Sequence, residues 1–270
     1  MTVVTTLMWL TVALYAVAAG LYVAFLAKGN EQGSRWSAWV LAAAVGSHLG
    51  FVATSWAIGG HPPTSDIHQA LSLMSLILVA VFLVLARTRE RLRVLGAFIT
   101  PVTLLLFLGA AMRRGAGEQV PEGVRSALLP VHVGVNVLGL AAFAVAFAAG
   151  AAYVIQERQL RRKQLGGLFQ RLPALDVLDQ LGLRSVLIGF PLLTIGVVTG
   201  TMWIVQGSLG LSATQGFGLL AWLLFAGVLL LRVAAGWRGR KAAIGTMLGF
   251  LCTMLVLVGY VVRDSFGAGA

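Results

Sequence analysis

Long apolar stretches alternate with short polar ones along the whole chain. Eight of them have about 20 residues each, at roughly 3–27, 36–58, 67–86, 94–112, 129–155, 185–206, 216–235 and 242–262. A helix rises 1.5 Å per residue, so about 20 apolar residues cross a hydrocarbon layer of roughly 30 Å. The pattern therefore predicts an all-α fold, a polytopic integral membrane bundle of eight transmembrane helices, in which residues 1–270 form a single domain.

The polar stretches between these helices differ sharply in charge. One set holds sixteen of the 20 Lys and Arg residues: Lys28, Arg35, Arg87, Arg89, Arg91, Arg93, Arg158, Arg161, Arg162, Lys163, Arg171, Arg184, Arg232, Arg238, Arg240 and Lys241. The other set holds only Arg113, Arg114, Arg125 and Arg263. Because Lys and Arg stay preferentially on the cytoplasmic side, the distribution predicts that both termini are extracytoplasmic. The first span has no basic residue before it and exceeds a signal-peptide core, so we expect it to be retained.

Composition narrows the range of functions. Apolar residues make up 59% of the chain and charged ones 11%, and the formal charge of +11 belongs to the predicted cytoplasmic loops, so we expect no nucleic-acid partner. Cys252 is the single cysteine, which excludes an internal disulfide and a Cys-x-x-Cys-His covalent haem site. No phosphate loop, zinc-protease motif or serine elbow occurs, and the protein is predicted not to be an enzyme.

Acidic residues are confined to predicted loops and helix ends. Coupled transporters generally need an ionisable residue inside the bundle, and only His48 lies there in the predicted arrangement. A secondary transporter is therefore disfavoured, although a small-molecule permease remains a third hypothesis.

The stretch 156–184 is the largest predicted cytoplasmic segment. Its apolar residues recur at helical spacing among basic ones: Leu165, Leu168, Phe169 and Leu172. This pattern predicts an interfacial helix lying on anionic lipid, and the alternative is a docking surface for a protein.

Histidines are the residues that point to chemistry. His48 lies about ten residues from the outer end of its helix, roughly 15 Å deep at 1.5 Å per residue. At that depth an imidazole is either hydrogen-bonded to a neighbouring helix or bound to an iron such as that of haem. His68 shares a helix face with Ser72 and Ser75, which we expect to point into the bundle. His132 shares a face with Asn136 and Gly139.

His61 lies in a short predicted outer loop, where we expect a solvated side chain. The longer outer loop from Arg113 to Leu128 carries three arginines that could pair with carboxylates of a ligand, or be solvated.

Several stretches, in this order and spacing, resemble the cytochrome c assembly family, the CcsA/ResC group, and most closely its HemX-like branch. The resemblance covers nearly the whole chain. It rests on Gly46-Ser47-His48-Leu49, Pro63 to Leu73, His132, Tyr153 to Leu160, Leu172 to Asp176, Gly189 to Thr194 and Gly236 to Ala243. It implies a bacterial cytoplasmic (inner) membrane protein that binds haem b non-covalently between histidines near its outer face.

The chain departs from that family at three places. The outer loop Gly207 to Gln215 contains neither Trp nor Asp, where haem-delivering members carry a tryptophan-rich motif ending in Trp-Asp. Val228 to Leu231 are aliphatic, and Arg263 follows the last span, where further histidines are expected. These departures favour a retained or sensed haem over delivery to a cytochrome.

Two hypotheses from different classes follow. In the first, the protein handles haem: His132 and His68 are the candidate axial ligands of the haem iron, and His48 marks a deeper cofactor-binding position, with membrane lipid and a cytochrome c biogenesis protein as partners. In the second, it is a haem-free membrane adaptor or regulator that acts through basic cytoplasmic loops. The resemblance to the HemX-like branch implies glutamyl-tRNA reductase as a partner for that role.

Overall fold

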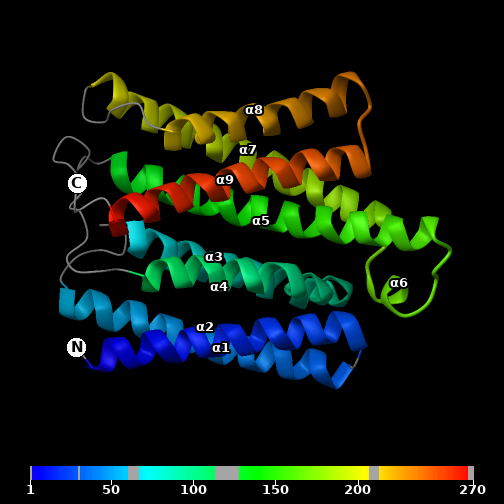
Figure 1. Cartoon of the computed structure of the whole chain (residues 1–270), viewed down its shortest axis with the longest axis horizontal. Coiled ribbons are helices and arrows are strands. Elements are labelled where there is room, and N and C mark those ends of the chain that lie inside the picture. Colours follow the sequence, from blue (N-terminus) through cyan, green and yellow to red (C-terminus); the bar gives the residue numbers. More distant parts are fainter. Residues whose placement is uncertain (1, 30, 60–66, 113–127, 207–212, 267–270) are drawn as a thin grey trace.

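The structure is an antiparallel bundle of long helices (Figure 1). This computed structural model describes residues 2–29, 31–59, 67–112, 128–206 and 213–266. Within them lie α1 (Thr2–Lys28), α2 (Glu31–Gly59), α3 (Ile67–Thr88), the 3₁₀ helix η1 (Glu90–Leu95), α4 (Gly96–Ala111), α5 (Leu128–Arg161), α6 (Leu168–Arg171), α7 (Leu175–Val205), α8 (Ala213–Ala234) and α9 (Arg240–Phe266).

The helices pack as neighbouring pairs around α5. α1 packs against α2 and α4, α3 against α4 and α5, α5 against α7 and α9, and α8 against α9. Figure 1 shows α1 and α2 at one edge of the bundle, α8 at the opposite edge and α5 between them. The start of α1 and the end of α9 lie at the same end of the bundle. We refer to this end as the outer end and to the opposite one as the inner end, following the predicted orientation.

The eight predicted spans are confirmed. In the described residues eight helical segments are long and apolar enough to cross a membrane, and the fold is all-α, with no strand in that part of the chain. Large apolar side chains such as Trp39, Leu105 and Val233 are exposed on the outside of the bundle, which suits a surface in contact with lipid. The placement of the termini outside the cell stays a prediction.

The inner end differs from the expectation at two places. α7 begins at Leu175, well before the predicted start at 185, so Asp176 and Asp179 belong to a helix and not to a loop. The predicted interfacial helix within 156–184 shrinks to the single turn of α6. Arg171 fixes the position of α6, because the Arg171 guanidinium donates to the carbonyls of Leu26 (2.9 Å) and Ala27 at the end of α1.

Glycines let α5 and α7 approach closely. A Cβ atom on Gly189 would lie 2.7 Å from the ring of Phe143, and one on Gly196 would lie 2.5 Å from the amide oxygen of Asn136. Gly139 of α5 faces the backbone of Gly189 in return. Small residues at such positions allow helices to pack in a membrane. The face of α5 that carries Asn136 and Gly139 is thus filled by another helix.

Candidate functional site

His48 of α2 lies where α2 meets α1, α3 and α4. Its side chain is fully buried, its Nδ1 lies 2.9 Å from the Tyr15 hydroxyl of α1, and its Nε2 lies 2.8 Å from the Ser72 hydroxyl of α3. The ring of Phe107 in α4 packs against it with centroids 4.4 Å apart. Both ring nitrogens are therefore engaged by protein hydroxyls, which is the hydrogen-bonded alternative considered for this residue.

His68 lies in the first turn of α3 at the outer end. The side chains of His68, Ser72 and Ser75 are all buried, so the prediction that this face points into the bundle is confirmed. The Nδ1 atom of His68 lies 2.8 Å from the carbonyl oxygen of Gly109, near the end of α4. A carbonyl can only accept a hydrogen bond, so Nδ1 carries the proton, and in the neutral ring Nε2 carries the lone pair.

His132 lies in the second turn of α5 and contacts α7. Its Nδ1 atom lies 2.7 Å from the hydroxyl of Thr199, which itself donates to the carbonyl of Ile195 at 2.8 Å. A hydroxyl has one hydrogen, so it must accept from His132. The proton again sits on Nδ1 and the lone pair on Nε2. Metal-binding histidines commonly have this arrangement, in which the far nitrogen is fixed by a protein acceptor.

The indole of Trp203 completes the surroundings of His132. Its ring lies T-shaped to the imidazole, with centroids 5.0 Å apart. Trp203 is buried in the last full turn of α7, and within the described residues its Nε1 has no hydrogen-bond partner. Gly200 gives the imidazole room, since a Cβ there would meet its Cε1 atom at 3.4 Å.

The three candidate histidines fall into two groups. His48 and His68 both meet α3, one through Ser72 and the other as part of that helix. The contacts of His132 are with α7. His61 and the arginines of the 113–127 loop lie outside the described residues. Sequence reasoning missed Thr199 and Trp203, although their spacing of four residues on one helix face could have linked them.

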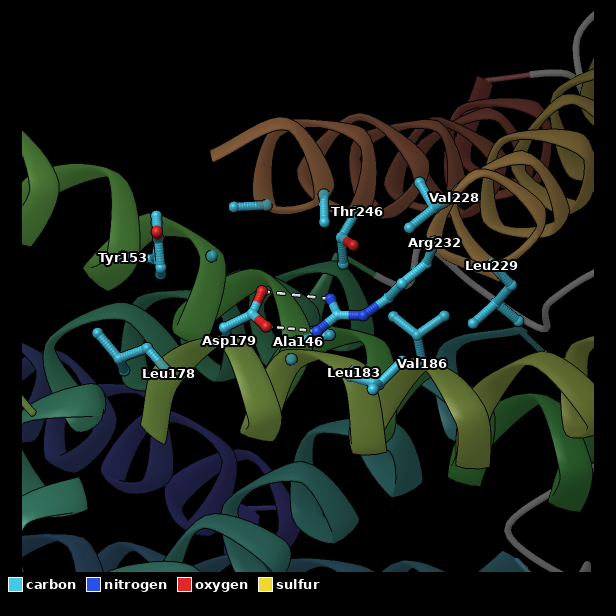
Figure 2. Close-up of a pocket in the computed structure, with 14 residues that line it drawn as sticks. Ala146, Tyr153, Leu178, Asp179, Leu183, Val186, Val228, Leu229, Arg232 and Thr246 are labelled. Atoms are coloured by element: carbon cyan, nitrogen blue, oxygen red, sulfur yellow. Dashed lines mark hydrogen bonds and ion pairs between the residues drawn. The ribbon is translucent and has the colours of Figure 1, made fainter. Parts of the chain in front are cut away.

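A charged group that sequence reasoning also missed lies at the inner end. The Asp179 carboxylate of α7 binds the Arg232 guanidinium of α8 through both oxygens, one of them at 3.2 Å (Figure 2). The side chains are only 15% and 12% exposed. The same carboxylate accepts the backbone N–H of Gly239 at 2.9 Å, just before α9 begins. One acidic residue therefore joins α7, α8 and α9.

A small cavity borders this ion pair. Tyr153, Asp179, Arg232 and Thr246 line it together with aliphatic residues (Figure 2). Its volume is about 20 Å³, which is room for about one water molecule. This cavity is far too small for a macrocycle.

Known proteins are similar in sequence to most of this chain. The family model described as cytochrome C assembly protein matches residues 64–263. The chain is 27% identical over 241 residues to the cytochrome c biogenesis protein CcsA of Prochlorococcus marinus, covering 79% of this chain and 76% of the relative. It is 26% identical over 276 residues to CcsA of Gloeobacter violaceus, covering 81% of each chain. With CcsA of Synechococcus elongatus it shares 28% identity over 244 residues, covering 72% and 74%.

Proposed function

The chain belongs to the cytochrome c assembly protein family, and from this premise we propose that it binds haem within the membrane as a carrier, reservoir or sensor and not as an enzyme. The family and the eight spans make it a multi-pass membrane protein. The bacterial inner membrane and non-covalent haem b are part of the proposal. So is a partner from cytochrome c biogenesis.

The hydrogen bonding of His132 carries the proposal. Its Nδ1 proton is fixed by Thr199, whose hydroxyl is in turn fixed by the carbonyl of Ile195. The Nε2 lone pair is thus held in a set orientation, as expected of an imidazole that binds iron. His68 has the same tautomer through Gly109, and α3 and α5, which carry the two residues near their first turns, both begin at the outer end. His132 and His68 are therefore the candidate haem ligands of this proposal.

His48 fits that role poorly. To bind iron it would have to give up its hydrogen bond to Tyr15 or to Ser72, and it would leave a buried hydroxyl without its partner. We therefore propose that His132 and His68 are the iron ligands and that His48 holds α1, α2 and α3 together. A bound haem would supply an iron centre, and this chain would supply the imidazoles that orient it.

The alternative of a haem-free regulator has less support. The relatives named above are cytochrome c biogenesis proteins, and nothing in them speaks for glutamyl-tRNA reductase as a partner. The HemX-like branch stays a prediction. The loop from 207 to 215 still lacks Trp and Asp, so we propose retention or sensing of haem ahead of its delivery.

Absorbance spectroscopy tests this function. Protein purified in detergent and supplied with haem should show a Soret band of a histidine-ligated haem. His132→Ala and His68→Ala should each weaken haem binding and shift the band, whereas His48→Ala and the control His61→Ala should keep it. If the wild-type protein takes up no haem, or if His132→Ala leaves affinity and spectrum unchanged, the proposal is wrong.

A further inference from the structure

Trp203 has a buried donor without an acceptor. Its side chain is 3% exposed, and its Nε1 has no hydrogen-bond partner in the part of the chain that the structure describes. An indole N–H can only donate, so only an acceptor atom can satisfy it. A buried polar group that lacks a partner destabilises the fold, and most such groups in native proteins are paired.

Trp222 shows how the same fold satisfies an indole. Its Nε1 donates to the hydroxyl of Thr194 at 3.0 Å, across the contact between α8 and α7. α7 thus provides an acceptor for the indole of Trp222 but, among the described residues, none for the indole of its own Trp203. The lack of an acceptor at Trp203 is therefore a local property of the outer end of α7.

The contact between Trp203 and His132 indicates which kind of ligand could supply the missing acceptor. The indole is in ring contact with His132, whose Nε2 lone pair is set by Thr199 on the same helix as Trp203. The ring whose N–H lacks an acceptor is thus in contact with the ring whose Nε2 atom carries a lone pair. A ligand that suits both offers a metal or another Lewis acid together with an oxygen acceptor, the strongest of which is a carboxylate.

We propose that Trp203 is a specificity-determining residue that donates its indole N–H to a carboxylate of the ligand bound at His132. This inference rests on the proposed function: if the ligand is haem, the acceptor is one of its propionates. Trp203 then favours porphyrins that carry free carboxylates, while His132 binds the iron whatever groups surround the ring. Coordination and a hydrogen bond form, and no covalent bond within the ligand changes.

Two iron porphyrins separate these roles. The purified protein is titrated with haem and with iron octaethylporphyrin, which has no carboxylate, and both affinities are followed at the Soret band. The wild-type protein should favour haem. Trp203→Phe keeps an aromatic ring but removes the N–H, and it should lower the affinity for haem by about tenfold or more while leaving that for octaethylporphyrin unchanged. The two porphyrins partition differently into detergent micelles. This difference cancels when the ratio of the two affinities is compared between variants.

Trp222→Phe is the matched control, since it removes an indole N–H that already has a protein acceptor, and it should leave the ratio unchanged. If Trp203→Phe does not fold, the wild-type ratio decides: equal affinity for the two porphyrins overturns the inference. Equal losses of both porphyrins in Trp203→Phe would mean a packing role, and no loss would mean that water satisfies the N–H, and either result overturns it. If neither porphyrin binds, the proposed function itself is wrong and this inference falls with it.

Discussion

The Tyr15 hydroxyl lies 2.9 Å from Nδ1 of His48, and this contact joins α1 to α2 in the interior of the bundle. Hydrogen bonds between membrane helices contribute about 0.6 kcal/mol on average and up to about 1.7. Because both groups are buried, we expect Tyr15→Phe to lower the free energy of unfolding by about 1 kcal/mol. Reversible unfolding in mixed micelles measures it.

Thr253→Val is the control for that variant, because the Thr253 hydroxyl donates to the carbonyl of Gly249 in its own helix, and among the described residues it bonds to no other helix. Tyr15→Phe combined with Ser72→Ala should destabilise the protein more than either change alone, since His48 then loses both partners. A fully stable double variant would show that His48 is held by something other than these two hydroxyls.

The ion pair at the inner end should be sensitive to the loss of one partner. Asp179→Ala leaves the guanidinium of Arg232 and the N–H of Gly239 without their acceptor. Removing one member of a fully buried pair costs about 3–5 kcal/mol, and we expect about 2–3 here because the pair is partly exposed. The thermal midpoint of purified protein should fall by several degrees.

Removing both charges should be less harmful than removing one. Asp179→Asn combined with Arg232→Met keeps an oxygen for Gly239 and leaves no unpaired charge, so part of the lost stability should return. Arg161→Ala is the surface control, since that arginine side chain is 71% exposed and Glu157 keeps Arg240 as a second partner at 3.5 Å. An Asp179→Ala protein as stable as Arg161→Ala would contradict a stabilising role for the pair.

The glycine contact between α5 and α7 makes a steric prediction. A methyl group at position 196 would lie 2.5 Å from the Asn136 amide oxygen, so Gly196→Ala must push the helices apart or move that side chain. Overpacking of this kind costs about 1–3 kcal/mol. Gly134→Ala, on the neighbouring helix, meets nothing within 4 Å and should be neutral. Thermal unfolding of the two variants compares them directly, and equal midpoints would refute the close contact.

The orientation of the bundle can be tested with cysteines. In a Cys252→Ser background, a cysteine that replaces Thr2 should react with a membrane-impermeant maleimide added to intact spheroplasts. One at Arg162 should react only after the membrane is permeabilised. The opposite pattern would reverse the predicted orientation, and with it the side from which His132 meets a ligand.

The transmembrane helices could be predicted because hydrophobic length alone determines them. The predicted spans 67–86 and 129–155 correspond to α3 and α5 with their starts placed within one residue. The start of α7 could not be found in this way. Asp176, Asp179 and Arg184 lower the hydropathy of its first turns, and the helix is stabilised there by partners distant in sequence such as Arg232.

The candidate site was predicted only in part. Helical spacing placed His68 and Ser72 on one buried face, because that relation is local. The partners that fix each imidazole come from other helices, and Gly109 and Thr199 lie 41 and 67 positions away from theirs. Tertiary packing chooses such pairs. A single sequence records the histidines but not the atoms that hold their protons.

The Asp179 carboxylate binds a side chain of α8 and the backbone just ahead of α9. The final hairpin of the chain is therefore docked through a residue that the ribosome has made some fifty positions earlier. When α8 and α9 insert, α7 is already in the bilayer, and its Asp179 is the residue to which they dock. Loss of Asp179 would consequently show itself in a cell as poor assembly and early proteolysis, before any ligand is involved.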